Sequence, residues 1–159
     1  PVRDGHAVVY LAVADDLIGV EALCAQVAAC TVTAVLDSVV VAEPVADAAS
    51  HTQLLAAAFM QQQRQALEMA HLRSGAVTHR IGYLRQLLSR TPGGQLVALE
   101  RNALPLLKDM AQIIDSCTET VCREINRQMP ARTPRKAAPA YSAWCGLVAP
   151  FAQPMGAAA

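Results

Sequence analysis

A chain of 159 residues is long enough to bury a hydrophobic core and short enough to form a single domain. Hydrophobic residues make up 53% of it and charged residues 16%, a composition that excludes an intrinsically disordered chain. The formal net charge is zero, aromatic residues contribute only 4%, and alanine dominates the apolar content. Small side chains favour close packing between helices and disfavour a β-sandwich, whose core needs wider side chains.

The net charge of zero conceals a strong asymmetry along the chain. Residues 4–63 contain seven acidic residues and no lysine or arginine, whereas residues 64–159 contain twelve basic and six acidic residues. Such a split is typical of proteins whose basic half binds nucleic acid or a membrane. The basic residues are spread out, so we favour the alternative that the acidic segment lies against the basic one, within one chain or between two. Arginine outnumbers lysine eleven to two, which fits a GC-rich genome such as that of an actinobacterium or a large DNA virus.

The N-terminal part of the chain predicts one ambiguous segment followed by one helix. Residues 6–14 are apolar and β-branched, which fits either a short strand or a buried helical turn. Asp15 and Asp16 supply an N-cap, and apolar residues then recur at helical spacing, which predicts a helix of about 25 residues that ends at Pro44. Residues 22–42 are apolar and long enough to span a bilayer, but they include an acidic residue and lack a basic anchor. We therefore expect no transmembrane segment.

A second helix is expected from Asp47 or Ser50 to Arg90. The glutamines of residues 61–65 and the arginines form its polar face. Glycine lowers helix stability by about 1 kcal/mol relative to alanine, so we expect a bend near Gly75. The apolar face comprises Leu54, Leu55, Phe59, Ala66, Ala70, Val77, Ile81, Leu84 and Leu88.

The sequence Thr-Pro-Gly-Gly at residues 91–94 predicts a turn before a third helix. The third helix has the cleanest spacing of apolar residues and is expected to run from Leu96 to a point before Pro130. Pro105 interrupts it, but the apolar stripe continues in phase on both sides, which predicts a kink. The stripe comprises Leu96, Leu99, Ala103, Leu106, Met110, Ile113 and Cys117. We expect a charged residue at Leu106 or Ile113 to unfold the protein or break its assembly.

Together these patterns predict an all-α fold. Residues 1–129 are expected to form an elongated bundle or hairpin of about three long amphipathic helices, and residues 130–159 a Pro/Ala-rich irregular tail or linker. Long helices leave apolar faces that one neighbour does not cover, so we expect a homodimer or an assembly with another helical protein. The chain begins at Pro1 without a secretion signal, so we expect a piece or processed product of an intracellular protein.

The residues that usually carry chemistry form no recognisable motif. The five cysteines lack the spacing of a zinc site, and Cys24 and Cys117 lie on apolar stripes, where we expect core packing. His71 and His79 are two helical turns apart on the polar side of the second helix. We therefore predict no catalytic residue, no metal site and no cofactor. The odd cysteine count favours a reducing compartment, the cytoplasm or the nucleus.

The best candidate for recognition is a basic stretch, mixed with prolines, that follows the third helix. Its residues are Arg127, Arg132, Arg135, Lys136 and the nearby Trp144. Such a segment binds nucleic acid, acidic lipid or an acidic protein face, although a solvated linker explains it more simply.

The sequence as a whole favours a non-enzymatic structural or protein-interaction module, a helical spacer or oligomerisation piece of a larger scaffold-type protein. A small-molecule or lipid-binding helical bundle is the first alternative. A nucleic-acid-binding protein that uses the Arg-rich second helix and the tail is the second.

Overall fold

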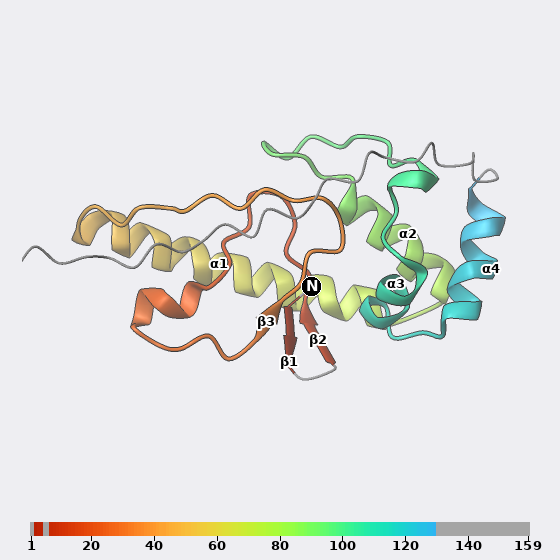
Figure 1. The fold of residues 1–159 in the computed structure, drawn as a ribbon, viewed down its shortest axis with the longest axis horizontal. Coiled ribbons are helices and arrows are strands. Elements are labelled where there is room, and N and C mark those ends of the chain that lie inside the picture. Colours follow the sequence, from red (N-terminus) through yellow and green to blue (C-terminus); the bar gives the residue numbers. More distant parts are fainter. Residues whose placement is uncertain (1, 5–6, 130–159) are drawn as a thin grey trace, which may run out of the picture.

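A computed structural model describes residues 2–4 and 7–129, and this part of the chain is mostly helical, as expected (Figure 1). The α-helices are α1 (Ala48–Arg73), α2 (Val77–Leu88), α3 (Leu107–Ile113) and α4 (Thr118–Gln128). Two short 3-10 helices, η1 (Val20–Cys24) and η2 (Arg101–Ala103), lie in the connecting segments. The strands are β1 (Val2–Asp4), β2 (Ala7–Tyr10) and β3 (Thr31–Val32).

The strands form a small antiparallel sheet in the order β2-β1-β3. Residues 6–14, for which the sequence left strand and helix open, therefore contribute strand β2. Val8 of β2 and the nearby Leu11 are both buried. Arg73, at the end of α1, donates a hydrogen bond to the Val8 carbonyl. These contacts attach the N-terminal segment to the helices.

The buried apolar residues form one cluster between β2, the C-terminal end of α1, and helices α2 to α4. Its members are Val8, Leu11, Met69, Leu72, Ile81, Leu84, Leu87, Met110, Ala111, Ile113, Ile114, Val121, Ile125 and Met129. No apolar residue between positions 12 and 64 is buried. The core therefore lies at one end of α1, and the N-terminal half of this helix extends away from it (Figure 1).

The helix that the sequence predicted between Asp15 and Pro44 does not form. The segment contains only η1, β3 and irregular backbone. Asp15, Gly19 and Ala25 have φ angles of 66°, 71° and 53°, which are incompatible with an α-helix. Valine and threonine recur along the rest of the segment and lose side-chain freedom in a helix. Because the segment buries no apolar residue, core packing does not compensate for this loss.

The second predicted helix begins where expected but is divided in two. The Asp47 carboxylate accepts a hydrogen bond from the Ser50 N–H at 2.7 Å, and the Ser50 hydroxyl accepts one from the Asp47 N–H at 3.0 Å. This reciprocal cap starts α1. Gly75, with a φ of 79°, separates α1 from α2, so a complete break replaces the expected bend. The turn at residues 91–94 is confirmed, since the Gly94 N–H donates to the Thr91 carbonyl at 2.9 Å.

The third predicted helix is wrong as a single element. The chain after Leu96 is irregular until η2, and α3 and α4 follow as separate short helices. Leu104, directly before Pro105, is extended with a ψ of 149°, because the proline ring disfavours helical backbone in the preceding residue. Asp115 then adopts a φ of 50° after α3, which prevents α3 from continuing into α4.

The apolar seam of this predicted helix is only partly buried. Met110 and Ile113 lie in the core, whereas Leu96 is 61% and Leu106 72% exposed. Cys117 is the exposed residue before α4 and does not pack in the core. The prediction that a charge at Leu106 would unfold the protein is therefore wrong, because a charge there stays in water.

Candidate functional site

The recognition stretch predicted from the sequence begins on α4, and only its first residue lies among the described residues. Arg127 is exposed and donates from Nε to Glu124 Oε2 at 3.0 Å. The Arg127 guanidinium and the Gln128 amide hold the pKa of Glu124 at about 2, below its usual 4.5. The other predicted residues, Arg132, Arg135, Lys136 and Trp144, lie outside the described part of the chain.

The arginines of the described helices do not form a free basic patch. Arg73 donates to the Val8 carbonyl, and Arg80 donates to the Ile114 carbonyl at 2.7 Å. The others pair within the chain as well: Arg64 with Asp16 and Glu68, Arg85 with Gln128, Arg90 with Glu68, Arg101 with Asn126, Arg123 with Glu119 and Arg127 with Glu124. Guanidiniums already engaged by internal acceptors are less available to phosphates.

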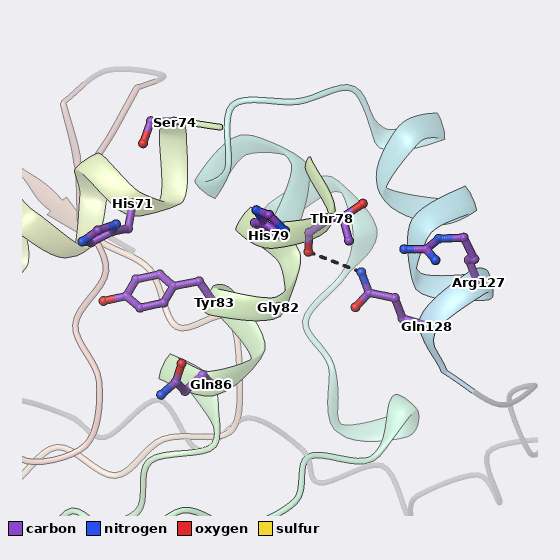
Figure 2. A pocket seen from close by; sticks show the side chains of 9 residues that line it. All are labelled: His71, Ser74, Thr78, His79, Gly82, Tyr83, Gln86, Arg127 and Gln128. Atoms are coloured by element: carbon purple, nitrogen blue, oxygen red, sulfur yellow. Dashed lines mark hydrogen bonds between the residues drawn. The ribbon is translucent and has the colours of Figure 1, made fainter. Parts of the chain in front are cut away.

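A polar groove of about 680 Å³ lies between the end of α1, α2 and the end of α4 (Figure 2). The Gln128 amide of α4 donates to the Thr78 carbonyl of α2 at 3.3 Å and joins two of its walls. The rings of His71 and Tyr83 lie 5.3 Å apart. The lining residues are His71, Ser74, Thr78, His79, Gly82, Tyr83, Gln86, Arg127 and Gln128. This lining suits a polar ligand better than a lipid, and both histidines are exposed, as expected.

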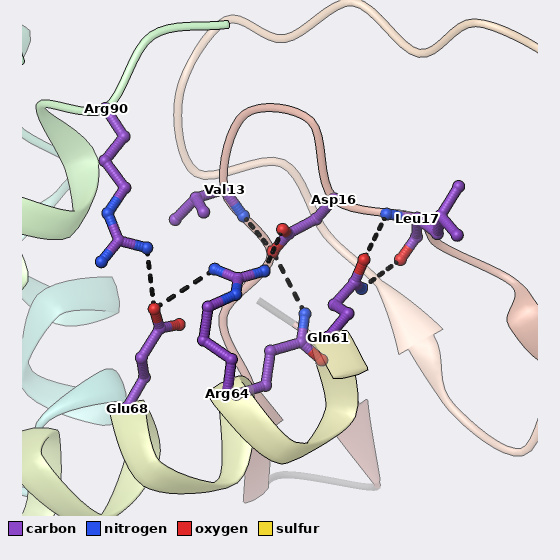
Figure 3. Close-up of polar contacts among 8 residues, drawn as sticks. Val13, Asp16, Leu17, Gln61, Arg64, Glu68 and Arg90 are labelled. Carbon is purple, nitrogen blue, oxygen red and sulfur yellow. Dashed lines mark hydrogen bonds and ion pairs between the residues drawn. The ribbon is translucent and has the colours of Figure 1, made fainter. Parts of the chain in front are cut away.

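Polar side chains fasten the loop before η1 to the inner face of α1 (Figure 3). The Asp16 side chain, 4% exposed, forms an ion pair with Arg64 and accepts a hydrogen bond from the Gln65 amide at 3.1 Å. It also accepts one from the Val13 N–H at 2.9 Å. The acidic segment thus meets the basic one within the chain, the arrangement that we favoured from the sequence. The pairing is between loop and helix, however, and not between two helices.

Three further residues, Gln61, Glu68 and Arg90, complete this cluster, which we call the polar clamp (Asp16, Gln61, Arg64, Gln65, Glu68 and Arg90). The Gln61 amide binds both the N–H and the carbonyl of Leu17, each at 2.7 Å. Glu68 accepts through Oε1 from Arg64 at 3.2 Å and from Arg90 at 2.8 Å. Its Oε2 is buried without a hydrogen-bond partner among the described residues. Two carboxylates and two guanidiniums balance in charge, so the clamp is an attachment of the loop rather than a reactive centre.

The opposite face of α1 carries apolar side chains that the described part of the chain leaves largely exposed. Phe59, Met60 and Leu67 are 58%, 67% and 66% exposed. The same face holds Ala56, Gln63, Ala66 and Ala70, all exposed. We call these seven residues the outward stripe. None of them is charged, which is unusual for a helix face in water, where lysine, glutamate and arginine are the common residues.

The sequence pattern missed this stripe because it assigned the faces of α1 incorrectly. It placed Phe59, Ala66 and Ala70 on the buried face, and the glutamines of residues 61–65 on the wet one. In the structure Gln65 is buried and Gln61 binds the loop. The signal that could have found the stripe is the absence of charge, since residues 48–63 contain no acidic residue, lysine or arginine.

The loop between η1 and α1 adds further exposed apolar surface. Val27, Val39, Val40 and Val41 are between 70% and 91% exposed. Exposed apolar side chains that lie together mark surfaces that bind other molecules. Residues 18–64, which comprise η1, the segment with β3 that follows it and the N-terminal half of α1, are called the arm below.

The remaining features give no site within the described residues. Cys24, Cys30, Cys117 and Cys122 are free, and Cys24 and Cys117 are exposed, so the expected core packing of these two is wrong. No group of histidine, cysteine, aspartate and glutamate side chains in the described part could hold a metal ion. None of its helices is long and apolar enough to cross a membrane.

Comparisons with known proteins found no match: no protein-family model, curated protein or solved structure matches the chain.

Proposed function

We propose that this chain is a non-enzymatic protein-interaction module, a helical spacer or oligomerisation piece of a larger scaffold-type protein, and that the arm is its docking surface. The observation that carries this proposal is that the described residues 12–64 include no buried apolar residue, although α1 there is a well-capped helix with an uncharged apolar face. Apolar surface of this extent is covered in most soluble proteins by a partner.

The partner that fits the arm is a second copy of the chain or another helical protein. A helix face with alanine at several positions admits a neighbouring helix closely, with axes about 8–10 Å apart. The free thiols of the described cysteines support a reducing compartment, the cytoplasm or the nucleus.

The two alternative functions have weaker support. The groove beside His71 and Tyr83 is the feature that favours a small-molecule-binding protein. Nucleic-acid binding through the second helix is disfavoured because its arginines are engaged by acceptors within the chain.

Site-specific photo-crosslinking in the natural host cell tests the proposed function. A photoreactive residue at Met60, in the outward stripe, should give a covalent adduct with another polypeptide. The matched control is the same residue at Arg123, an exposed position of α4, which should give none. Equal yields at both positions, or no adduct at Met60, would show that the arm is not a docking surface.

A further inference from the structure

The outward stripe is centred on Gln63. Counted from Gln63, the positions seven residues away are both alanine, Ala56 and Ala70, and those four residues away are both bulky, Phe59 and Leu67. The positions three residues away differ, since Met60 is bulky and Ala66 is small. The stripe therefore matches itself in reverse at four and seven residues from Gln63, and pairs a bulky residue with a small one at three.

Helical geometry places this stripe opposite the core. At about 3.6 residues per turn, residues at spacings of three, four and seven share one side of a helix. Gln65, Met69 and Leu72 point to the other side and are buried. The whole stripe thus faces solvent, and no described part of the chain covers it.

We propose that a second copy of this chain covers the outward stripe, with the two α1 helices antiparallel and the twofold axis beside Gln63. The proposal rests on the proposed function and names its partner. In this arrangement Phe59 lies opposite Leu67 of the second copy, Met60 opposite Ala66, and Ala56 opposite Ala70. A twofold interface needs a surface that complements itself, and these pairs supply one, because alanine lies opposite alanine and the bulky Met60 lies opposite the small Ala66.

Charge and side-chain size both favour self-pairing. A twofold axis brings identical residues together, so a charge near the axis would face its own copy and repel it. The stripe has no charge, and the residue on the axis is a glutamine, whose amide can donate to and accept from its twin. The alanines at both ends allow the helices to approach closely, while Phe59 and Leu67 fill the space between them.

The extent of the stripe predicts a weak dimer. From Ala56 to Ala70 the helix rises about 21 Å, so the contact is one helix wide and about four turns long. Contacts of this size lie at the lower end of specific interfaces, where association is transient. We therefore expect the dimer to dissociate in the micromolar range of protein concentration.

A pair of neighbouring substitutions tests the stripe by sedimentation equilibrium of the full chain. Gln63→Glu places two like charges at the axis and should raise the dissociation constant at least tenfold. Gln62→Glu adds the same charge on the same exposed helix, one position away and off the stripe, and should change it less than threefold. Circular dichroism should show the same helix content for both variants. Equal dissociation constants for the two variants, or a wild-type chain that stays monomeric at roughly 100 µM, would overturn the proposal.

Cross-linking with a short bismaleimide tests the antiparallel orientation, in a background whose five cysteines are replaced by serine. Gln63→Cys should cross-link to itself. Ala56→Cys alone should not, because its twin lies about 21 Å away along the helix axis, whereas Ala56→Cys combined with Ala70→Cys should. Rapid cross-linking of Ala56→Cys alone would show a parallel pair and contradict the proposal.

The identity of the adduct at Met60 separates this proposal from the proposed function. An adduct with a second copy of the chain supports both. An adduct with a different protein alone keeps the proposed function and overturns self-pairing, and the absence of any adduct overturns both.

Discussion

The two ends of α1 show how differently one continuous helix is stabilised along its length. The C-terminal end, from Gln65 to Arg73, contributes Met69 and Leu72 to the core and is fixed by packing. The N-terminal end, Ala48–Arg64, has no buried residue. It depends on the reciprocal cap between Asp47 and Ser50 and on alanine, glutamine and leucine, which are good helix formers. The comparison teaches that the core region holds the fold, whereas the arm is helical by local preference and presents a surface.

The largest contrast between the two regions is expected from Leu72 at the core end of α1 and Met60 in the arm. Leu72 is fully buried and Met60 is 67% exposed. Leu72→Ala should lower the free energy of unfolding by about 2–5 kcal/mol, because it removes buried contacts and leaves a cavity. Met60→Ala should change it by less than about 0.5 kcal/mol. Urea denaturation of the dilute, monomeric chain measures both values, and similar losses would erase the distinction between core and arm.

A smaller effect is expected at the polar clamp, which joins the two regions. Asp16→Ala removes the acceptor of Arg64, Gln65 and the Val13 N–H, so it should cost about 1–3 kcal/mol. The loop should also be cleaved faster by protease. Asp37→Ala, at an exposed acid between β3 and α1, should change stability by less than about 0.5 kcal/mol and leave the rate of cleavage unchanged. If both variants behave alike, the clamp does not attach the arm.

A still smaller effect on stability is expected from substitution of Glu124, which lies on the outer surface of the core region. Its pKa is lowered to about 2 by Arg127 and Gln128, so its contribution to stability is present above its ordinary pKa of 4.5. This contribution should disappear as the pH falls from 4.5 towards 2, because protonation removes the charge that Arg127 binds. Melting temperatures of wild type and Glu124→Gln should therefore differ slightly at pH 7 and converge at the acid end. A constant difference over this range would contradict the assignment.

The reactivity of the two exposed cysteines, Cys117 in the core region and Cys24 in the arm, compares the two regions without a measurement of stability. Hydrogen bonds from the Thr120 hydroxyl and N–H lower the pKa of Cys117, at the start of α4. Cys117 should therefore react with iodoacetamide at a lower pH than Cys24 of the arm, as mass spectrometry of tryptic peptides can measure. Thr120→Val should slow the reaction of Cys117 with iodoacetamide and leave the reaction of Cys24 unchanged. An equal pH profile for both thiols would show that the thiolate of Cys117 gains nothing from Thr120.

The candidate site was predictable from the sequence only in part. The basic stretch pointed to Arg127, which is exposed but held by Glu124. The outward stripe was not found, because Phe59 and Leu54 are equally apolar and periodicity alone does not say which of two apolar faces is buried. The absence of charge over residues 48–63 was the available clue.

By itself, the sequence determined the features that depend on neighbouring residues. The start of α1 follows from Asp47 and Ser50, and the turn at residues 91–94 follows from its proline and glycines, because these preferences act within a few residues. The mostly helical character likewise follows from composition and spacing.

Only the tertiary structure decided the rest, because the contacts involved join residues far apart in the chain. Asp16 meets Arg64 across 48 positions and thereby holds a loop where local spacing favoured a helix. Val8 became part of a strand because a sheet partner and the core were available to it. The inward face of α1 was chosen by Met69 and Leu72, which pack on α2 to α4 and leave the outward stripe around Gln63 facing solvent.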